Sequence, residues 1–312
     1  MLRYILIRIA TALPTLLGMS FVAFTIVALA PGDPVMMELR AMGVVPEPAD
    51  IAAIKADYGL DKPFFPRYFD WLGRAVRFDF GNSIATGRSV MAEIAIHLPA
   101  TLALAVSALF GAVAFSLILG AAAVSANRWT GAGLRGLTIL LVSVPSFWLA
   151  LLLIYSFVLK LGWAKLVGNG ALSDLVLPAL TLSLGAGAAL GRVVYERVRA
   201  EKCEDYIRLA IAKGLSPAAI LFGHIAPRII GPLATAWANT FGALLGGAVI
   251  VESIFGWPGL GQLILQAIAQ RDFPVIQAYL VFMGLTFFAT SLLADVIVIL
   301  SDPQLRRKVS HE

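Results

Sequence analysis

Charged residues are scarce in this chain of 312 residues. Lysine, arginine, aspartate and glutamate make up only 14% of the sequence, whereas hydrophobic residues make up 59%. A soluble globular domain carries about 25% charged residues and needs polar surface to cover its core. The composition therefore excludes an ordinary soluble enzyme. Intrinsic disorder is excluded as well, because disordered chains are poor in apolar residues. A protein that crosses a lipid bilayer several times remains.

Cysteine and histidine are also rare. The single cysteine, Cys203, excludes a disulfide within the chain. The three histidines are too far apart in sequence to show metal-ligand spacing, so we expect no metal site. The sequence contains neither a P-loop nor a His-Glu-x-x-His motif. We therefore expect no catalytic residues and no cofactor bound by this chain.

Apolar runs long enough to cross a membrane occur six times. A helix needs about 20 apolar residues to cross the hydrocarbon core. The first run is too long for the apolar region of a signal peptide, so we expect it to be retained. The sequence thus predicts an all-α polytopic membrane protein with six transmembrane helices. The predicted spans are Ile9–Ala30, Leu98–Ala126, Gly136–Leu159, Leu175–Gly191, Ile229–Val251 and Phe273–Leu300.

Basic residues concentrate on one side of the predicted membrane. The short loops and termini of that side contain 14 lysines and arginines, and the short loops of the other side contain 3. Short cytoplasmic loops are the ones enriched in Lys and Arg. We therefore expect both termini to be cytoplasmic. The net charge of +5 is explained by these loops and does not indicate nucleic-acid binding.

The spans divide the chain into four segments. Residues 1–30 form a cytoplasmic amino terminus and the first span, and residues 98–300 form a core of five helices. Residues 301–312 form a cytoplasmic tail. Residues 31–97 are too long for a simple connection, and we expect helices beginning near Asp50 and Pro66 there. This extracytoplasmic subdomain either lies on the membrane face or serves as a platform for a partner.

A loop at 192–228 predicts two short helices joined by a tight turn. Tyr206, Leu209, Ala210 and Lys213 follow the i, i+3, i+4, i+7 spacing of an amphipathic helix beginning at Asp205. Gly214 fits the position after a helix end, and Ser216-Pro217 fits the start of the next helix. The exposed apolar stripe indicates either a partner surface or a helix on the lipid interface.

The loop at 252–274 predicts irregular backbone close to the membrane. Gly256, Pro258, Gly259 and Gly261 favour a tight turn, and the following apolar stretch 263–269 is too short to cross a bilayer. Such backbone is tolerated where it packs in protein or lines a cavity. The loop is therefore a candidate for the outer lining of a translocation path.

A pair of glycines lies in the fifth predicted span. Gly242 and Gly246 form a small-xxx-small pattern, which favours close helix–helix packing.

Two segments resemble those of the permease subunits of bacterial dipeptide, oligopeptide and nickel ABC importers. Residues 205–216 are similar to the "EAA" loop, in which Ala210 and Gly214 match the general pattern. Arg208 stands where that pattern has Glu, and Leu209 stands where it has Ala. Residues 252–277 are similar to the family's extracytoplasmic motif before the last span. The start Met1-Leu2-Arg3-Tyr4 and the long first loop look like the B-type permease.

The resemblance implies a type I ABC importer permease fold in the bacterial cytoplasmic (inner) membrane. It also implies a C-type permease partner, an extracytoplasmic substrate-binding protein, and two ABC ATPases that carry ATP and magnesium. The implied ATPase-coupling residues are Asp205, Tyr206, Leu209, Ala210, Lys213 and Gly214. The implied extracytoplasmic gate and binding-protein contact consists of Phe255, Trp257, Pro258, Gly259, Arg271 and Asp272.

The function implied is half of a translocation path for di- or oligopeptides, without enzymatic activity in this chain. Import of nickel or a nickel chelate by the same type of complex is the first alternative. Glutathione, opines and short oligosaccharides also remain open as substrates. A secondary carrier that works alone is a weaker alternative, and a membrane enzyme is the weakest because no constellation of residues supports it.

Overall fold

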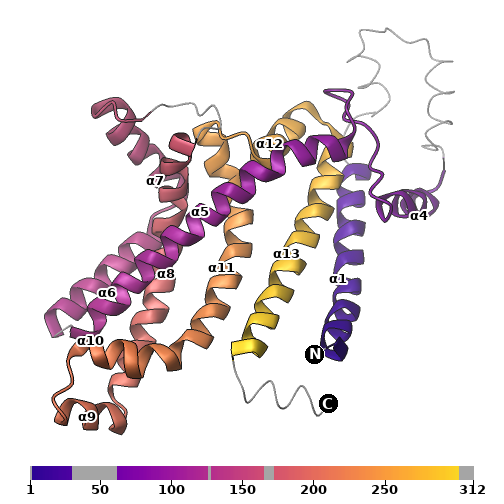
Figure 1. Ribbon diagram of the computed structural model, residues 1–312. Helices are drawn as coiled ribbons and strands as arrows, with labels where there is room; N and C mark the ends of the chain where they lie inside the picture. The colour runs from indigo at the N-terminus through magenta and orange to yellow at the C-terminus, as the bar shows by residue number, and fades with distance from the viewer. Residues whose placement is uncertain (1, 30–61, 126–127, 165–171, 302–312) are drawn as a thin grey trace. The chain divides into compact units, whose positions relative to one another are not determined.

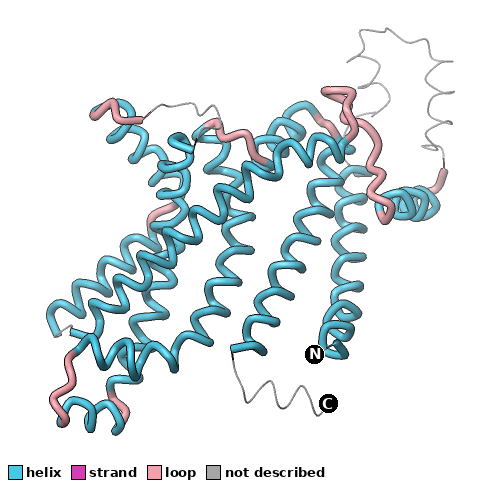
Figure 2. The backbone as a smooth tube through the Cα atoms, viewed as in Figure 1, coloured by secondary structure: helices cyan, strands magenta, loops and turns pink. Residues whose placement is uncertain are grey.

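The computed structural model describes residues 2–29, 62–125, 128–164 and 172–301. Within these residues the regular structure is helical, apart from one isolated β-bridge between Asn82 and Ser89 (Figures 1 and 2). The helices are α1 (Leu2–Leu29), α4 (Phe64–Ala75), α5 (Val90–Ser125), α6 (Arg128–Ser143), α7 (Ser146–Leu153), η1 (Ile154–Lys160), η2 (Leu172–Leu175), α8 (Val176–Lys202), α9 (Asp205–Ala212), α10 (Pro217–Ile220), η3 (Leu221–Ile225), α11 (Ala226–Phe255), α12 (Leu260–Gln270) and α13 (Phe273–Ser301).

The length and composition of these helices confirm the predicted membrane architecture. Five helical stretches are long and apolar enough to cross a bilayer, and a sixth is obtained if one bent pair counts as a single span. The five are Ile7–Leu29, Val90–Ala122, Ser173–Lys202, Pro217–Phe255 and Phe273–Val296.

The third predicted span is broken, which the hydropathy pattern did not predict. Its two halves, Trp129–Ser143 and Ser146–Lys160, are bent by 97°. The break falls at Val144 and Pro145, where proline lacks a backbone N–H and disfavours helical backbone in the residue before it. Hydropathy registers only how apolar a run is, so it detects no bend.

The loop subdomain predicted at 31–97 lies partly outside the described residues, including the helix expected near Asp50. The second expected helix is α4, which begins at Phe64 rather than at Pro66. An apolar stripe of Tyr68, Phe69, Trp71 and Leu72 was expected on this helix; Tyr68 and Trp71 are buried, whereas Phe69 is 63% exposed and lies outside the buried face.

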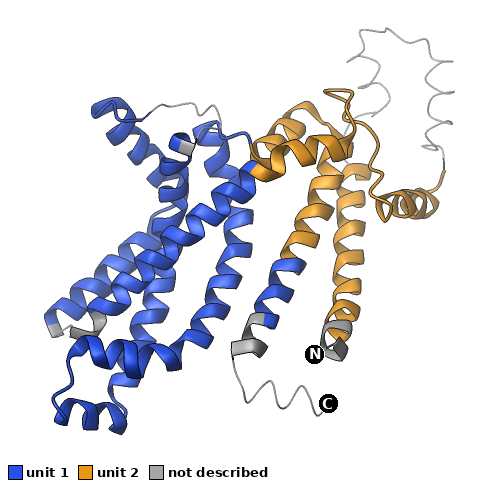
Figure 3. Ribbon diagram, viewed as in Figure 1, with its two compact units in different colours: residues 1–5, 100–258, 289–312 blue, residues 6–99, 259–288 orange. Residues whose placement is uncertain are grey.

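The chain forms two compact units (Figure 3). Unit 1 comprises residues 1–5, 100–258 and 289–312, and unit 2 comprises residues 6–99 and 259–288. The chain passes between the units within α1, α5 and α13 and after α11. The segment boundaries predicted from membrane topology stay predictions.

Unit 1 is organised around α8, which packs against α6, α7 and α11. The approach of α8 to α5 depends on small residues. A Cβ on Gly187 of α8 would lie 3.0 Å from both Cα and the carbonyl oxygen of Ala112 in α5. Glycine therefore permits a backbone contact that any larger residue would push apart.

Unit 2 contains an aromatic core between α1 and α4. Phe24 of α1 packs against Tyr68 and Trp71 of α4, with ring centroids 5.6 Å apart in both pairs. The Tyr68 hydroxyl and Ser20 Oγ share a buried hydrogen bond of 2.9 Å. On α13, Gly284 lies beside Met19 of α1, whose sulfur would be 2.9 Å from a Cβ at that position. The aromatic contacts and the Ser20–Tyr68 hydrogen bond hold α4 against α1, and the close approach at Gly284 joins α13 to the same helix.

Candidate functional site

The helix–turn–helix predicted in the loop at 192–228 is present as α9 and α10. Gly214 has φ +80°, the left-handed conformation expected after a helix end. Gly214 N donates to the Ile211 carbonyl at 2.9 Å, and Leu215 N donates to the Ala210 carbonyl at 3.2 Å, which is the Schellman pattern. Ser216 Oγ then accepts a hydrogen bond from Ala219 N at 3.2 Å and caps α10. Both predicted caps are confirmed.

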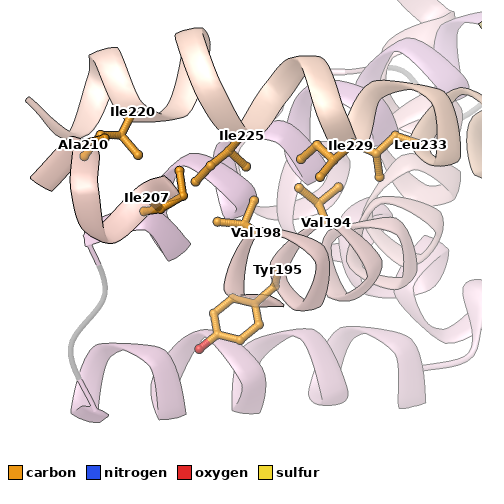
Figure 4. Packing of buried hydrophobic residues seen from close by; sticks show 9 residues of the cluster. All are labelled: Val194, Tyr195, Val198, Ile207, Ala210, Ile220, Ile225, Ile229 and Leu233. Atoms are coloured by element: carbon orange, nitrogen blue, oxygen red, sulfur yellow. The ribbon is translucent and has the colours of Figure 1, made fainter. Parts of the chain in front are cut away.

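One face of α9 is buried in an apolar cluster of unit 1. Ile207 is 1% exposed and Ala210 is 3% exposed. Their partners come from α8, α10, η3 and α11, so α9 is anchored to the two helices that flank its loop. The cluster comprises Val194, Tyr195, Val198, Ile207, Ala210, Ile220, Ile225, Ile229 and Leu233 (Figure 4).

The opposite face of α9 is exposed and partly apolar. Leu209 and Ile211 are each 56% exposed, and Arg208 and Lys213 are exposed beside them. Asp205 is also exposed and pairs with Arg208 at 3.3 Å. Exposed apolar side chains that gather on one part of a surface are typical of a protein interface.

Among the predicted coupling residues, Ala210 and Tyr206 lie apart from this exposed face. Ala210 belongs to the buried cluster. Tyr206 is half-buried and contacts two other helices. Its hydroxyl donates a hydrogen bond to Glu201 Oε2 in the last turn of α8. The Arg228 guanidinium, in the first turn of α11, lies over its ring at 4.3 Å from the centroid.

The surroundings of Tyr206 change its acidity. Burial, followed by the hydrogen bond to Glu201 and the negative charge of that carboxylate, raises the pKa of Tyr206 to about 12 from 10.0. The Arg228 guanidinium lowers this pKa, but by less than the other effects raise it. Sequence reasoning named Tyr206 but missed Glu201 and Arg228, because nothing in their local pattern marks them as its partners.

Two of the predicted gate residues in unit 1 are buried rather than exposed. Phe255 and Trp257 are each 4% exposed, whereas Pro258 is exposed. Trp257 Nε1 donates a hydrogen bond of 2.8 Å to the Ala100 carbonyl of α5. Gly256, with φ +62°, ends α11 in the left-handed conformation and turns the chain towards Trp257.

A buried carboxylate lies next to the turn at Gly256 and Trp257. Glu252, in the last turn of α11, is 0% exposed and accepts a hydrogen bond of 2.7 Å from Thr101 Oγ1 of α5. Its backbone carbonyl accepts a second bond from Trp257 N at 2.8 Å. Polar contacts at Glu252 and Trp257 therefore join the end of α11 to residues 100–101 within α5.

The gate residues of unit 2 differ from one another in exposure. Gly259 is the extended N-cap residue of α12, and Arg271 ends α12 in a left-handed conformation with its side chain exposed. Asp272 is 2% exposed. Its Oδ2 accepts hydrogen bonds from Ser83 Oγ at 2.5 Å and from Ala85 N at 3.3 Å. Asp272 thus fixes the turn around Ser83, whereas the side chain of Arg271 is exposed on the surface.

Of the two predicted packing glycines, Gly246 does not form a close contact of the kind seen at Gly187. Within the described chain, no atom lies within 4 Å of the position that a Cβ on Gly246 would take. The roles of Gly242 and Gly246 in packing stay predictions. Among the described residues, no group of three or more His, Cys, Asp or Glu side chains could hold a metal ion.

Comparison with known proteins gives matches over nearly the whole chain. Residues 112–307 match the family of binding-protein-dependent transport system inner membrane components, and residues 1–105 match the amino-terminal region of such components. The glutathione transport system permease protein GsiC of Salmonella typhimurium (strain LT2) is 35% identical over 309 residues, covering 99% of this chain and 100% of that protein. A relative in Brucella abortus (strain 2308), with the provisional name peptide transport system permease protein, is 35% identical over 311 residues, covering 97% and 98%.

A solved structure has the same fold. An inward-facing conformation of the MetNI methionine ABC transporter contains a chain that matches with a TM-score of 0.60 and 20% identity, covering 68% of this chain and 97% of that chain. Transport systems of the matched family combine a multi-pass inner-membrane permease with a substrate-binding protein and an ATPase. The chain belongs to this family of ABC importer permeases, with the type I importer fold.

Proposed function

We propose that this chain is the B-type permease of an importer of di- or oligopeptides and forms half of the translocation path beside a C-type permease. The main observation is the construction of α9. Ile207 and Ala210 anchor the helix inside the chain, while Leu209 and Ile211 remain exposed. An anchored helix with an apolar outer face fits a docking site for an ATPase subunit.

The proposed topology places α9 and both termini in the cytoplasm. The excess of lysine and arginine in the short loops on that side supports this orientation. Two ATPase subunits would then reach α9 and carry the ATP and magnesium. The chain itself would bind no cofactor and catalyse no reaction. The substrate-binding protein would deliver solute on the opposite side, near Pro258 and Arg271.

In the proposed cycle, ATP closes the two ATPases and draws the paired α9 helices together. Because α9 shares a buried cluster with α8 and α11, its displacement moves both helices. The path then changes from inward-facing to outward-facing and accepts solute from the binding protein. Hydrolysis restores the inward-facing state and releases the solute inside.

The names of the relatives support a peptide-like substrate. GsiC is named for glutathione, a tripeptide, and the Brucella relative is named for peptides. Nickel or a nickel chelate remains the alternative substrate of the same type of complex. Competition experiments would separate them: uptake of a labelled peptide in the presence of excess nickel, and uptake of labelled nickel in the presence of excess peptide.

The first test is to tag the chain, extract it in mild detergent and identify the proteins that co-purify. We expect a second six-span permease and P-loop ATPases. Reconstituted with the binding protein, this complex should take up peptide only with ATP. A chain that purifies alone and transports solute without ATP would contradict the proposal in favour of a stand-alone carrier.

A matched pair of variants tests the role of the α9 turn. Gly214→Val forces a β-branched residue into a left-handed conformation, so it should abolish uptake while membrane insertion persists. Gly133→Val is the control, because Gly133 lies in α6 with ordinary φ and no atom within 4 Å of a Cβ. Normal uptake by the Gly214 variant would refute the assignment of this turn.

A further inference from the structure

Three side chains link α9 to the helices on both sides of its loop. Tyr206 of α9 donates a hydrogen bond to Glu201 of α8, and its ring lies under the Arg228 guanidinium of α11. We call Glu201, Tyr206 and Arg228 the Tyr206 triad. None of its members is among the nine residues of the buried apolar cluster. Tyr206 only packs against the edge of that cluster.

The backbone route from α9 to α11 contains a weak point. Between α10 and α11 the chain forms the π-helical turn η3, closed by a hydrogen bond from Ala226 N to the Leu221 carbonyl. Pro227 follows directly and has no N–H to donate back into this turn. Isolated π-helical turns are frequent at functional sites in helices. We expect bending to concentrate at η3 when force acts on α9.

The contact between Tyr206 and Arg228 bypasses that turn. Arg228 lies in the first turn of α11, beyond η3, so displacement of α9 reaches α11 without depending on the π-helical hydrogen bonds. On the other side, Glu201 lies in the last turn of α8, ahead of the short connection to α9. One tyrosine therefore contacts both helices that α9 must move.

We propose that Tyr206 is a positioning residue that transmits the movement of α9 to α8 and α11 through Glu201 and Arg228. The inference rests on the proposed function, because it assumes that an ATPase displaces α9. It adds to the proposed function the three residues that transmit the movement of α9. Docking would belong to the exposed side chains of Leu209 and Ile211, whereas the Tyr206 triad would transmit movement in addition to the buried apolar cluster.

The separation of the triad from the cluster makes the proposal testable without unfolding the loop. We expect the anchoring residues Ile207 and Ala210 to stay in place when Tyr206 loses its hydroxyl, because that hydroxyl bonds to Glu201 and not to the cluster. The variant Tyr206→Phe removes the hydrogen bond to Glu201 but keeps the ring under Arg228. Tyr206→Leu removes both contacts. Binding of the ATPases should persist in both variants.

The experiment measures solute uptake per ATP hydrolysed by the complete complex in proteoliposomes with its binding protein. We expect this ratio to fall about threefold to tenfold in Tyr206→Phe and further in Tyr206→Leu, a range that corresponds to the coupling energies seen for residues between linked sites. Glu201→Ala should behave like Tyr206→Phe. Glu201→Gln should retain much of the wild-type ratio of uptake to hydrolysis, because its amide oxygen can still accept a hydrogen bond from the Tyr206 hydroxyl.

The control is Tyr195→Phe. Tyr195 belongs to the apolar cluster against which Tyr206 packs. It also lies near an arginine, because the Arg135 guanidinium is 6.0 Å from its ring centroid. No hydrogen bond of its hydroxyl occurs within the described chain. Its variant should keep the wild-type ratio. A loss in Tyr195→Phe equal to that in Tyr206→Phe would show a general packing effect and overturn the proposal.

Two further outcomes also overturn it. A wild-type ratio of uptake to hydrolysis in Tyr206→Leu would show that the triad transmits nothing. Loss of ATPase co-purification in Tyr206→Phe would show that the tyrosine contributes to docking instead. Failure of the proposed function looks different, because the wild-type chain itself would then lack ATPase partners or transport without ATP.

Discussion

Ser83 and Asp272 are separated by 189 residues in the sequence, yet Ser83 Oγ donates a hydrogen bond of 2.5 Å to Asp272 Oδ2. Both side chains are buried, at 3% and 2% exposed. The same carboxylate oxygen accepts a bond from Ala85 N, and Oδ1 lies 3.5 Å from Val275 N at the start of α13. Asp272 therefore fixes both a distant turn and the entry to the last membrane-spanning helix.

Replacing Asp272 with alanine should destabilise unit 2. The buried hydroxyl of Ser83 would lose its acceptor, at a cost of about 1–3 kcal/mol, and the exposed Ala85 would lose the acceptor of its N–H as well. We expect a lower midpoint of thermal unfolding in detergent and faster proteolysis of the turn at 79–89. Asp272→Asn should lose less stability, because its amide oxygen still accepts a hydrogen bond.

Asp79→Ala is the matched control for this prediction. Asp79 is exposed and accepts a hydrogen bond of 3.1 Å from Gly81 N in the same turn. Removal of an exposed carboxylate changes stability by less than about 0.5 kcal/mol. If Asp272→Ala unfolds at the same temperature as Asp79→Ala, the buried hydrogen bonds of Asp272 do not stabilise the fold.

Thr101 and Glu252 form the corresponding buried contact in unit 1. Thr101→Val keeps the shape of the side chain but removes the hydroxyl that donates to Glu252 Oε1. The buried carboxylate loses one donor, so we expect a loss of about 1–3 kcal/mol in the free energy of unfolding. Thr101→Ser keeps the hydroxyl and loses only a buried methyl group, so it should lose about 0.8 kcal/mol. Equal unfolding midpoints for the valine and serine variants would contradict the prediction.

The sequence predicted the elements of this fold better than their contacts. Long apolar runs specify membrane spans because nearly every residue of such a helix is apolar, whichever way it faces. The sharp bend at Val144 and Pro145 was missed, although the proline that accompanies it was visible. A proline indicates where a helix can break but not whether the surrounding helices require a break.

In the functional segments, features set by neighbouring residues were predicted, and contacts between residues far apart in the sequence were not. Gly214 and Ser216 were predicted as caps because capping depends on neighbouring residues. The buried face of α9 was not predicted, since apolar residues occur around most of its circumference and several faces satisfy the helical spacing. The partners of Tyr206 and Asp272 come from other elements, and no local pattern identifies them.

Tyr206 should titrate well above an ordinary tyrosine. Its pKa is raised to about 12 from 10.0, first by burial and then by Glu201. The folded protein therefore favours the neutral phenol, and the resulting stability is present below pH 10.0 and lost as the pH rises through about 12. The difference in tyrosinate absorbance between the wild type and Tyr206→Phe, recorded against pH, measures this titration.

Glu201→Gln provides the check on the cause. It removes the negative charge that opposes tyrosinate formation, so the pKa of Tyr206 should move back towards 10.0. A titration near pH 10 in the wild-type protein would show that the hydroxyl is solvated rather than bonded to Glu201. That result would also remove the structural basis for the proposed role of the Tyr206 triad.

The contact between α5 and α8 gives a prediction about stability with a control in the same helix. A Cβ at Gly187 would lie 3.0 Å from backbone atoms of Ala112, and backbone cannot move aside as a flexible side chain can. Gly187→Ala should therefore destabilise the protein by about 1–3 kcal/mol, the usual cost of overpacking. Gly185→Ala, two residues earlier in α8, has no atom within 4 Å of its Cβ position and should be neutral or slightly stabilising. Thermal unfolding in detergent compares the two variants. If Gly187→Ala is as stable as Gly185→Ala, then α5 and α8 do not pack as closely as the structure shows.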